Sequence, residues 1–183
     1  MKGNPQSASR TAPLQKEPKR HINNCAARRA ALFKIVAERE RNMTIVYSDT
    51  KKDLPSEQLH KLFISVGWSD GSETADMIKK YNIPFLNATL VISAWEQERL
   101  IGAVRVLSDK MFRSIIYDLL VLPEFQNKGV GKELIKRCIA HFPSSEWLVQ
   151  TRENTASYYE RNGFTVNHDV FLTIPCKLFS STE

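Results

Sequence analysis

The sequence of 183 residues predicts an α/β protein built on one mixed sheet with helices on both of its faces. Two observations support this fold class. Short runs of β-branched and aromatic residues alternate along the chain with amphipathic helical patterns. Proline, glycine and polar residues separate these runs, as they do where strands and helices end. The predicted order is strand, helix, helix, three strands, helix, strand, helix and strand, with a small extra strand near 164–166.

The expected strands share β-branched, aromatic or alternating apolar residues, so the sheet should have six to seven strands. The six clearer ones span 44–47, 89–95, 100–107, 114–121, 147–151 and 170–178. Polar residues 96–98 join the second strand to the third, and this short polar connection predicts a hairpin.

Four helical patterns lie between the strands. The first should end at Gly67, since glycine is common just after the last turn of a helix. The second should end before Pro84, because proline disrupts a helix interior. The fourth should have Asn154 as its N-cap. The helices are expected at 54–66, 73–81, 130–142 and 155–162.

Positive charge is concentrated near the start of the chain. Residues 1–41 contain ten Lys or Arg and three Glu, which leaves 16 basic and 17 acidic residues elsewhere. We therefore expect a basic, partly disordered extension over 1–41 and a nearly neutral folded domain over 42–183. A near-neutral domain gives no support to specific nucleic-acid binding. Residues 26–41 resemble a basic amphipathic helix, which a transit peptide, a membrane-surface contact, a partner contact or packing on the domain would explain.

The cysteines Cys25, Cys138 and Cys176 lack the spacing of a zinc site or a disulfide framework. They fit a reducing compartment. No apolar run is long enough to span a membrane. We therefore expect a cytoplasmic protein without a bound metal. An organellar matrix is the alternative if residues 1–41 are a transit peptide.

The segment Gln126-Asn127-Lys128-Gly129-Val130-Gly131-Lys132 predicts a phosphate-binding loop at the start of a helix. Its two glycines let backbone N–H groups converge on an anion, and its lysines add positive charge. Glu133 stands where a P-loop needs Ser or Thr, so nucleoside triphosphate chemistry is disfavoured. Leu134 stands where a dinucleotide-binding motif needs its third glycine.

The pattern Gln-x-x-Gly-x-Gly directly after Leu-x-Val-x-Pro resembles the acyl-CoA pyrophosphate loop of the GNAT superfamily of N-acetyltransferases. This resemblance implies a mainly antiparallel sheet that splays at strands four and five, with acetyl-CoA as co-substrate and no metal. It makes 42–183 the acyl-CoA-binding domain. The cofactor-binding residues that it implies are Leu119, Leu120, Val121, Gln126, Asn127, Lys128, Gly129, Val130, Gly131, Lys132, Asn154 and Tyr159.

The resemblance also assigns catalytic roles. The backbone of Leu119 and Val121 should hold the pantetheine arm, with the Leu119 N–H directed at the thioester carbonyl, where it would stabilise the developing oxyanion. Tyr159, four residues before Gly163, matches the residue that protonates the departing thiolate. The alternative is that Tyr159 only bonds the sulfur and closes the cleft. Tyr158 is interpreted as packing in the core or the cofactor wall.

An attacking amine must lose a proton, and no motif identifies the base. Asp118 is the best-placed candidate, because it lies on the strand that carries the oxyanion donor. It could equally be an ordinary acid that pairs with a nearby Arg, and a chain of water molecules would also serve.

The segment 62–68, Leu-Phe-Ile-Ser-Val-Gly-Trp, resembles a GNAT branch of bacteria and plant plastids that includes serotonin (arylalkylamine) N-acetyltransferase-like enzymes. It implies an aromatic acceptor pocket of Phe63, Trp68 and Phe85, with a loop-anchoring Trp as the alternative. The predicted function is acetyl transfer from acetyl-CoA to a primary amine of a small molecule, by direct attack in a ternary complex. The alternatives are a protein lysine or N-terminal acetyltransferase and a non-catalytic acyl-CoA-binding module. Whether the protein forms a homodimer stays open.

Overall fold

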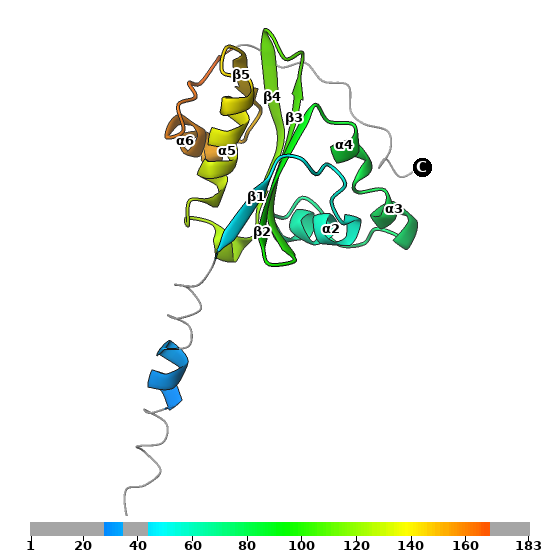
Figure 1. Ribbon diagram of the computed structural model, residues 1–183, viewed down its shortest axis with the longest axis vertical. Helices are drawn as coiled ribbons and strands as arrows, with labels where there is room; N and C mark the ends of the chain where they lie inside the picture. Colours follow the sequence, from blue (N-terminus) through cyan, green and yellow to red (C-terminus); the bar gives the residue numbers. More distant parts are fainter. Residues whose placement is uncertain (1–27, 35–43, 169–183) are drawn as a thin grey trace, which may run out of the picture. The chain divides into compact units, whose positions relative to one another are not determined.

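One five-stranded sheet organises residues 44–168 (Figure 1). The computed structural model describes residues 28–34 and 44–168. Residues 28–34 form a helix with exposed side chains, within the helix predicted for 26–41. The rest of that predicted helix and the strand expected at 170–178 lie outside the described residues.

The strands occur in the sheet in their order along the chain. The first four pair in antiparallel fashion, and β5 joins β4 in parallel. Residues 164–168 have no regular structure, so the small extra strand predicted near 164–166 is wrong. The five strands of the described region are β1 (Ile45–Ser48), β2 (Leu90–Glu96), β3 (Arg99–Ser108), β4 (Arg113–Val121) and β5 (Glu146–Val149).

Helices cover both faces of the sheet. In Figure 1, α2, α3 and α4 lie on one side of it, and α5 and α6 lie on the other. A short 3-10 helix, Pro123–Phe125, connects β4 to the loop before α5. The α-helices of the domain are α2 (Ser56–Ser65), α3 (Ala75–Lys79), α4 (Ile83–Leu86), α5 (Val130–His141) and α6 (Glu153–Glu160).

The single helix predicted at 73–81 is corrected to α3 followed by the separate short helix α4. Pro84 lies in the first turn of α4 rather than beyond a helix end. Proline is tolerated there because the first N–H groups of a helix have no partner within it. The Asn82 carbonyl accepts from the N–H groups of Phe85 and Leu86, each at 3.0 Å, and so starts this turn.

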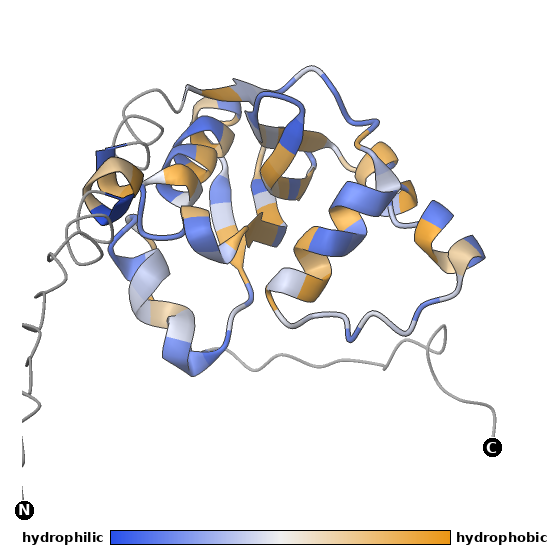
Figure 2. Cartoon of the chain, turned by 90° about the horizontal axis from the view of Figure 1, so that it is seen from below, coloured by the Kyte–Doolittle hydropathy of each residue, from blue (hydrophilic) through white to orange (hydrophobic). Residues whose placement is uncertain are grey.

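The core has two layers, one on each side of the sheet. Leu59 and Leu62 of α2 are fully buried, as is Leu134 of α5. Figure 2 shows mainly apolar strands between helices that carry both apolar and polar residues. A Cβ on Gly102 of β3 would lie 3.1 Å from the Leu120 carbonyl oxygen and 3.4 Å from Leu134 Cδ1. The absence of a side chain at Gly102 therefore lets α5 pack closely on the sheet, which fixes the start of this helix beside the end of β4.

A β-bulge interrupts the pairing of β3 with β4. Arg105 is opposite Asp118, whereas Val106 is opposite Ile116, so Tyr117 is the extra residue. The Arg105 guanidinium pairs with Asp118 and lies 4.6 Å from the ring centroid of Tyr117. Successive residues of a regular strand point to opposite faces, yet here Tyr117 and Asp118 both contact the Arg105 side chain. A bulge bends its strand and increases the local twist.

Candidate active site

A cleft of about 820 Å³ opens where β4 leaves β5. The parallel ladder ends at the pair Ile116 and Val149, directly before the bulged residue Tyr117. Ligands commonly bind beyond the carboxyl ends of parallel strands, and this volume falls within the usual range for ligand pockets. The cleft is lined by residues of the strands, of α5 and α6, of the loops next to them, and of the segment that follows α2. They are Val66, Trp68, Ile116, Tyr117, Leu119, Val121, Gln126, Asn127, Gly131, Val149, Gln150, Thr151, Arg152, Asn154, Thr155, Tyr158, Tyr159 and Arg161.

The strand residues of the predicted site divide according to the alternation of β4. Leu119 and Val121 line the cleft. Leu120 is fully buried and is not among the lining residues. The structure thus brings the two residues predicted to hold pantetheine to the cleft, while the side chain of Leu120 belongs to the core.

The predicted phosphate loop has the backbone of an anion-binding turn. Asn127 and Gly129 have φ angles of 58° and 85°, in the left-handed region that asparagine and glycine tolerate. Gly129 is the N-cap of α5, and no side chain caps this end of the helix. Its first N–H groups therefore remain suited to an external acceptor. Gln126 Nε2 donates to the Val121 carbonyl at 3.0 Å and ties the loop to β4, while Val130 is buried beneath it.

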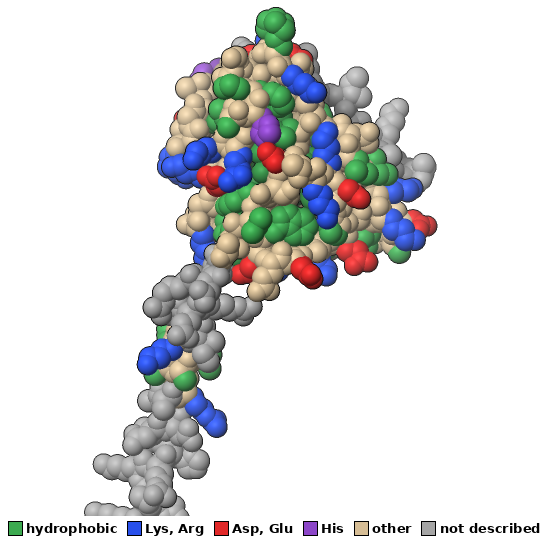
Figure 3. Space-filling view, in the orientation of Figure 1, with side chains coloured by type: hydrophobic (Ala, Val, Ile, Leu, Met, Phe, Trp, Pro, Cys, Tyr) green, Lys and Arg blue, Asp and Glu red, His purple; other side chains and the backbone are tan. Residues whose placement is uncertain are grey.

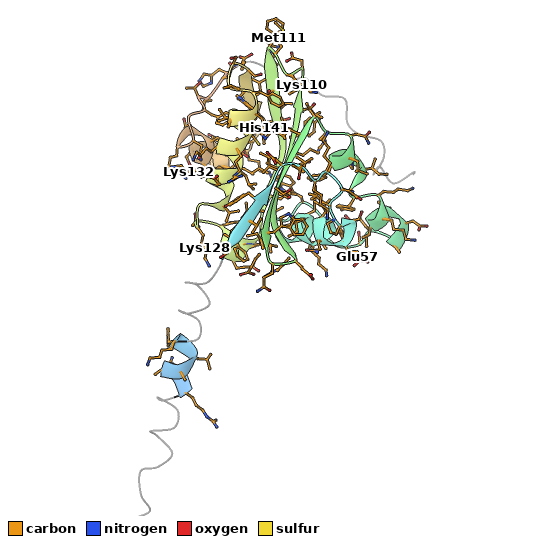
Figure 4. All side chains as sticks on the ribbon, viewed as in Figure 1. Glu57, Lys110, Met111, Lys128, Lys132 and His141 are labelled. Carbon is orange, nitrogen blue, oxygen red and sulfur yellow. The ribbon has the colours of Figure 1, made fainter. Side chains whose placement is uncertain are left out.

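The two loop lysines are exposed and lie outside the cleft lining. The Lys128 ammonium is 5.6 Å from the centroid of the Phe125 ring. Figure 4 shows Lys128 and Lys132 on the outer side of the domain near α5, and Figure 3 shows further basic side chains spread over the visible face. In the structure described, these lysines supply a positive field near the loop rather than a contact inside the cleft.

Two arginines of the lining, Arg152 and Arg161, are not among the residues predicted from the sequence. Arg152 follows β5 at the carboxyl end of a parallel strand, which is where a ligand is expected. Arg161 comes three residues after Tyr158, so both residues fall on one side of the helical turn. The position of Arg152 after a strand and the spacing of Arg161 from Tyr158 are the signals in the sequence that could have revealed these two arginines.

Both tyrosines of α6 line the cleft, and their rings meet edge to face with centroids 5.2 Å apart. Burial raises the pKa of Tyr159 to about 12, with a further contribution from Tyr158. Burial also raises the pKa of Tyr158, against a smaller opposing effect of Arg161. Both hydroxyls are therefore protonated at neutral pH and can donate hydrogen bonds.

Asn154 lines the cleft, but the prediction that it caps its helix is wrong. The N-cap is Arg152, whose carbonyl accepts from the Thr155 N–H at 2.9 Å. The helix begins at Glu153, two residues earlier than predicted, because the Arg152 carbonyl already accepts the hydrogen bond of its first turn. Asn154 therefore lies in the first turn, four residues before Tyr158 on the same helical face.

The structure does not bring Asp118 together with the other predicted catalytic groups. Its side chain pairs with Arg105, and Asp118 is not among the described residues that line the cleft. The guanidinium also lies 5.9 Å from the centroid of the Phe85 ring. The arrangement matches the alternative interpretation of Asp118, an acid paired with a nearby arginine.

The predicted aromatic pocket is present in part. Trp68 lines the cleft, is half exposed and meets Phe63 edge to face at 5.9 Å. Phe63 and the fully buried Phe85 lie behind it and are not part of the lining. Tyr117, which the sequence analysis missed, is the second half-exposed aromatic residue of the lining. Trp68 and Tyr117 are thus the most exposed of the four described aromatic residues that line the cleft, the others being Tyr158 and Tyr159.

Comparison with known proteins identifies the family. A family model for the acetyltransferase (GNAT) domain matches residues 67–173. This chain belongs to the GNAT family. It is similar to the uncharacterized N-acetyltransferase ycf52 of Pyropia yezoensis, with 28% identity over 131 residues, 68% of this chain and 72% of the relative. It is also similar to the chloroplastic GCN5-related N-acetyltransferase 2 of Arabidopsis thaliana, with 33% identity over 81 residues, 44% of this chain and 26% of the relative.

A solved structure with the same fold is that of a GNAT-family acetyltransferase from Streptococcus pneumoniae. Its TM-score is 0.57 at 21% identity, and the match covers 74% of this chain and 99% of that one. GNAT acetyltransferases take their acetyl group from acetyl-CoA, and the chain is an acyl-CoA-dependent N-acetyltransferase.

In this GNAT enzyme, Cys138 is fully buried in α5 and is not among the lining residues. Burial raises the pKa of its thiol to about 12. Within residues 28–34 and 44–168, no group of three or more His, Cys, Asp or Glu is placed to hold a metal ion. In the same part of the chain, no helix has both the length and the apolar character needed to cross a membrane.

Proposed function

We propose that this GNAT enzyme transfers an acetyl group from acetyl-CoA to the primary amine of a small molecule, by direct attack in a ternary complex. The decisive observation is the cleft at the divergence of β4 and β5, which residues of α5, α6 and the segment after α2 line. Such a cleft gives acyl donor and amine separate approaches to one point, which favours direct transfer.

The residues at one end of the cleft fit the diphosphate and pantetheine of acetyl-CoA. The uncapped start of α5 and the left-handed residues Asn127 and Gly129 offer backbone N–H groups to a diphosphate. Lys128 and Lys132 add an attractive field outside, and Arg152 adds a charge inside. The part of β4 from Leu119 to Val121 pairs with β3 but has no partner on the β5 side among the described residues, so it would hold the extended amide arm there as a neighbouring strand would. Asn154 also lines the cleft.

Two groups would perform the chemistry. The Leu119 N–H would donate to the thioester carbonyl oxygen, whose negative charge grows as the amine attacks. The protonated Tyr159 hydroxyl would donate to the sulfur and supply its proton as the bond to carbon breaks. Since Asp118 is committed to Arg105, we propose that the ammonium proton leaves to water in the open cleft.

The acceptor that we propose is an amine with an aromatic or otherwise flat apolar group. The half-exposed rings of Trp68 and Tyr117 could receive such a group, and Phe63 supports the first ring. The resemblance of 62–68 to the serotonin (arylalkylamine) N-acetyltransferase-like branch agrees with this choice.

A panel of acceptors tests the proposal. Thiol release from acetyl-CoA would be followed with 2-phenylethylamine, an amino sugar, an aminoglycoside and lysine-containing peptides. We expect the highest kcat/KM for 2-phenylethylamine, and a Trp68→Ala variant should raise its KM while the KM for acetyl-CoA stays the same. Activity confined to peptides would instead identify a protein acetyltransferase. Coenzyme A binding without turnover of any amine would favour a non-catalytic module.

We propose an organellar rather than a cytoplasmic location. The names of relatives such as the chloroplastic Arabidopsis protein support this choice. A fluorescent fusion of the full chain, compared with one that lacks residues 1–41, tests it. The first should enter an organelle and the second should stay in the cytosol, and identical distributions would contradict the proposal.

A further inference from the structure

We propose that the Tyr158 hydroxyl is a ligand of the coenzyme A diphosphate. The inference rests on the proposed acyl-CoA site and adds to it a side chain that the sequence analysis interpreted as packing. Tyr158 would act beside the backbone N–H groups at the start of α5, whereas Tyr159 acts at the sulfur.

The position of the hydroxyl is fixed by its relation to Gly131. A Cβ built on Gly131 would overlap the Tyr158 hydroxyl oxygen and would lie 3.4 Å from Cζ of the same ring. The hydroxyl therefore lies directly against the backbone of the second helical residue of α5. Gly131 and Tyr158 both line the cleft, so this contact occurs inside it.

Among the described residues, the hydroxyl is held in place by packing rather than by a hydrogen bond of its own. The Tyr158 ring packs on Tyr159, and its backbone carbonyl accepts from Asn162 Nδ2 at 2.7 Å. Within the described residues, no hydrogen bond to the Tyr158 hydroxyl is formed, and the oxygen is not sealed from solvent. A polar group that is fixed but still open to the cleft is able to bond a ligand there without first breaking a bond within the protein.

The chemistry of the hydroxyl matches a phosphate oxygen. Because it stays protonated at neutral pH, it donates, and a phosphate oxygen only accepts. Hydrogen bonds to charged groups are roughly twice as strong as neutral ones. Arg161, whose positive charge acts on Tyr158, also lines the cleft and would attract the same anion. The hydroxyl thus lies beside the start of α5, and the guanidinium adds a positive charge to the same cleft.

Isothermal titration of the full chain with coenzyme A and with dephospho-coenzyme A tests the proposal. Both ligands carry the diphosphate, and only the first carries the 3′-phosphate. We expect the Tyr158→Phe variant to bind each of them about tenfold more weakly than the wild type. Tyr47→Phe is the matched control, because it removes a tyrosine hydroxyl outside the described cleft lining, and it should bind both ligands like the wild type. Urea unfolding of each variant reports whether the fold is retained.

A third ligand separates the diphosphate from the pantetheine arm. S-acetylpantetheine lacks the diphosphate, and its weak binding is measurable by NMR titration. Tyr158→Phe should bind it like the wild type. Wild-type affinity of Tyr158→Phe for coenzyme A would overturn the inference, and so would equal weakening for S-acetylpantetheine or a loss confined to the ligand with the 3′-phosphate. A wild-type chain that does not bind coenzyme A would instead overturn the proposed function.

Discussion

Arg105 and Asp118 form an ion pair across the β3–β4 ladder at the bulge, directly beside the cleft. Their side chains are only 14% and 12% exposed. The same guanidinium stacks on Tyr117, so the pair holds the residue at which β4 turns away from β5. Asp118, the candidate general base of the sequence prediction, therefore helps to shape the cleft through its ion pair with Arg105.

Replacing Asp118 with Asn should mainly reduce stability. The change leaves the Arg105 charge unpaired in a largely buried place, so we expect a loss of about 2–3 kcal/mol in the free energy of unfolding. Urea titration measures it. The matched control is Glu146→Gln, which breaks the exposed pair with Arg113 and should cost less than about 1 kcal/mol.

Turnover of the Asp118→Asn variant separates the two interpretations of this residue. If Asp118 only supports the bulge, the acidic limb of the pH–rate profile should stay where it is in the wild type. A variant with wild-type stability, a strong fall in kcat and a lost acidic limb would show that Asp118 is the base after all.

Replacing Tyr159 with Phe should slow turnover while binding of coenzyme A stays the same. The variant keeps the ring that packs on Phe164 at 5.7 Å, and it loses only the hydroxyl that donates to the leaving sulfur. We expect kcat to fall about 100-fold, as is usual for the loss of a proton donor. Stopped-flow detection of released thiol measures this. Unchanged kcat would remove Tyr159 from its proposed role and leave it as a wall of the cleft.

The sequence contained enough information for most of the fold, because much of that information is local. The β-branched runs on both sides of residues 96–98 predict β2, β3 and their hairpin, and Gln97 adopts the positive φ of 55° that a tight turn allows. Gly67, the predicted end of the first helix, follows α2 and has a φ of 75°. The loop before α5 was found for the same reason, since glycine spacing and a helix start lie in one short segment.

The remaining features depend on contacts between distant parts of the chain. Residues 114–121 read as a regular strand, and nothing local shows that Tyr117 is a bulge, because the bulge is defined by the register with β3. The partner of Asp118 lies 13 residues away, so the place of this acid on the strand of the oxyanion donor could not show that it pairs with Arg105. The Tyr158 hydroxyl reaches the start of α5 through a contact with Gly131, 27 residues away, which no local pattern shows.

Cys138 should be chemically silent in the folded enzyme. Burial raises the pKa of its thiol to about 12, so almost no thiolate is present at pH 8. In a variant with Ser at positions 25 and 176, Cys138 should react with a thiol reagent only after unfolding. Cys138→Ala should retain kcat, with a modest loss of stability. Trapping of an acetyl group on Cys138 after incubation with acetyl-CoA, detected by mass spectrometry, would contradict direct transfer.

Glu73 should make the enzyme sensitive to acid through the segment that carries Trp68. Its carboxylate accepts from the Ser69 hydroxyl at 2.6 and 2.8 Å and from the Tyr81 hydroxyl at 2.5 Å. His60 Nε2 lies 2.8 Å away. These hydrogen bonds, with Ser69 first, lower the pKa of Glu73 from 4.5 to about 2. They connect the loop after α2 to the residues on each side of it, so Trp68 is presented by an anchored loop.

The sign of the effect follows from the lowered pKa. The folded state holds the Glu73 proton less tightly than the unfolded chain, so the stabilisation is present above about pH 4.5 and is lost as the pH falls towards 2. Urea unfolding of the wild type and Glu73→Gln between pH 7 and pH 2 measures it. The stability difference between them should be constant above pH 5 and should shrink below it. Asp76→Asn, at an exposed acid beside Lys79, is the control and should show no such change. A difference independent of pH would mean that Glu73 stabilises the loop only by packing.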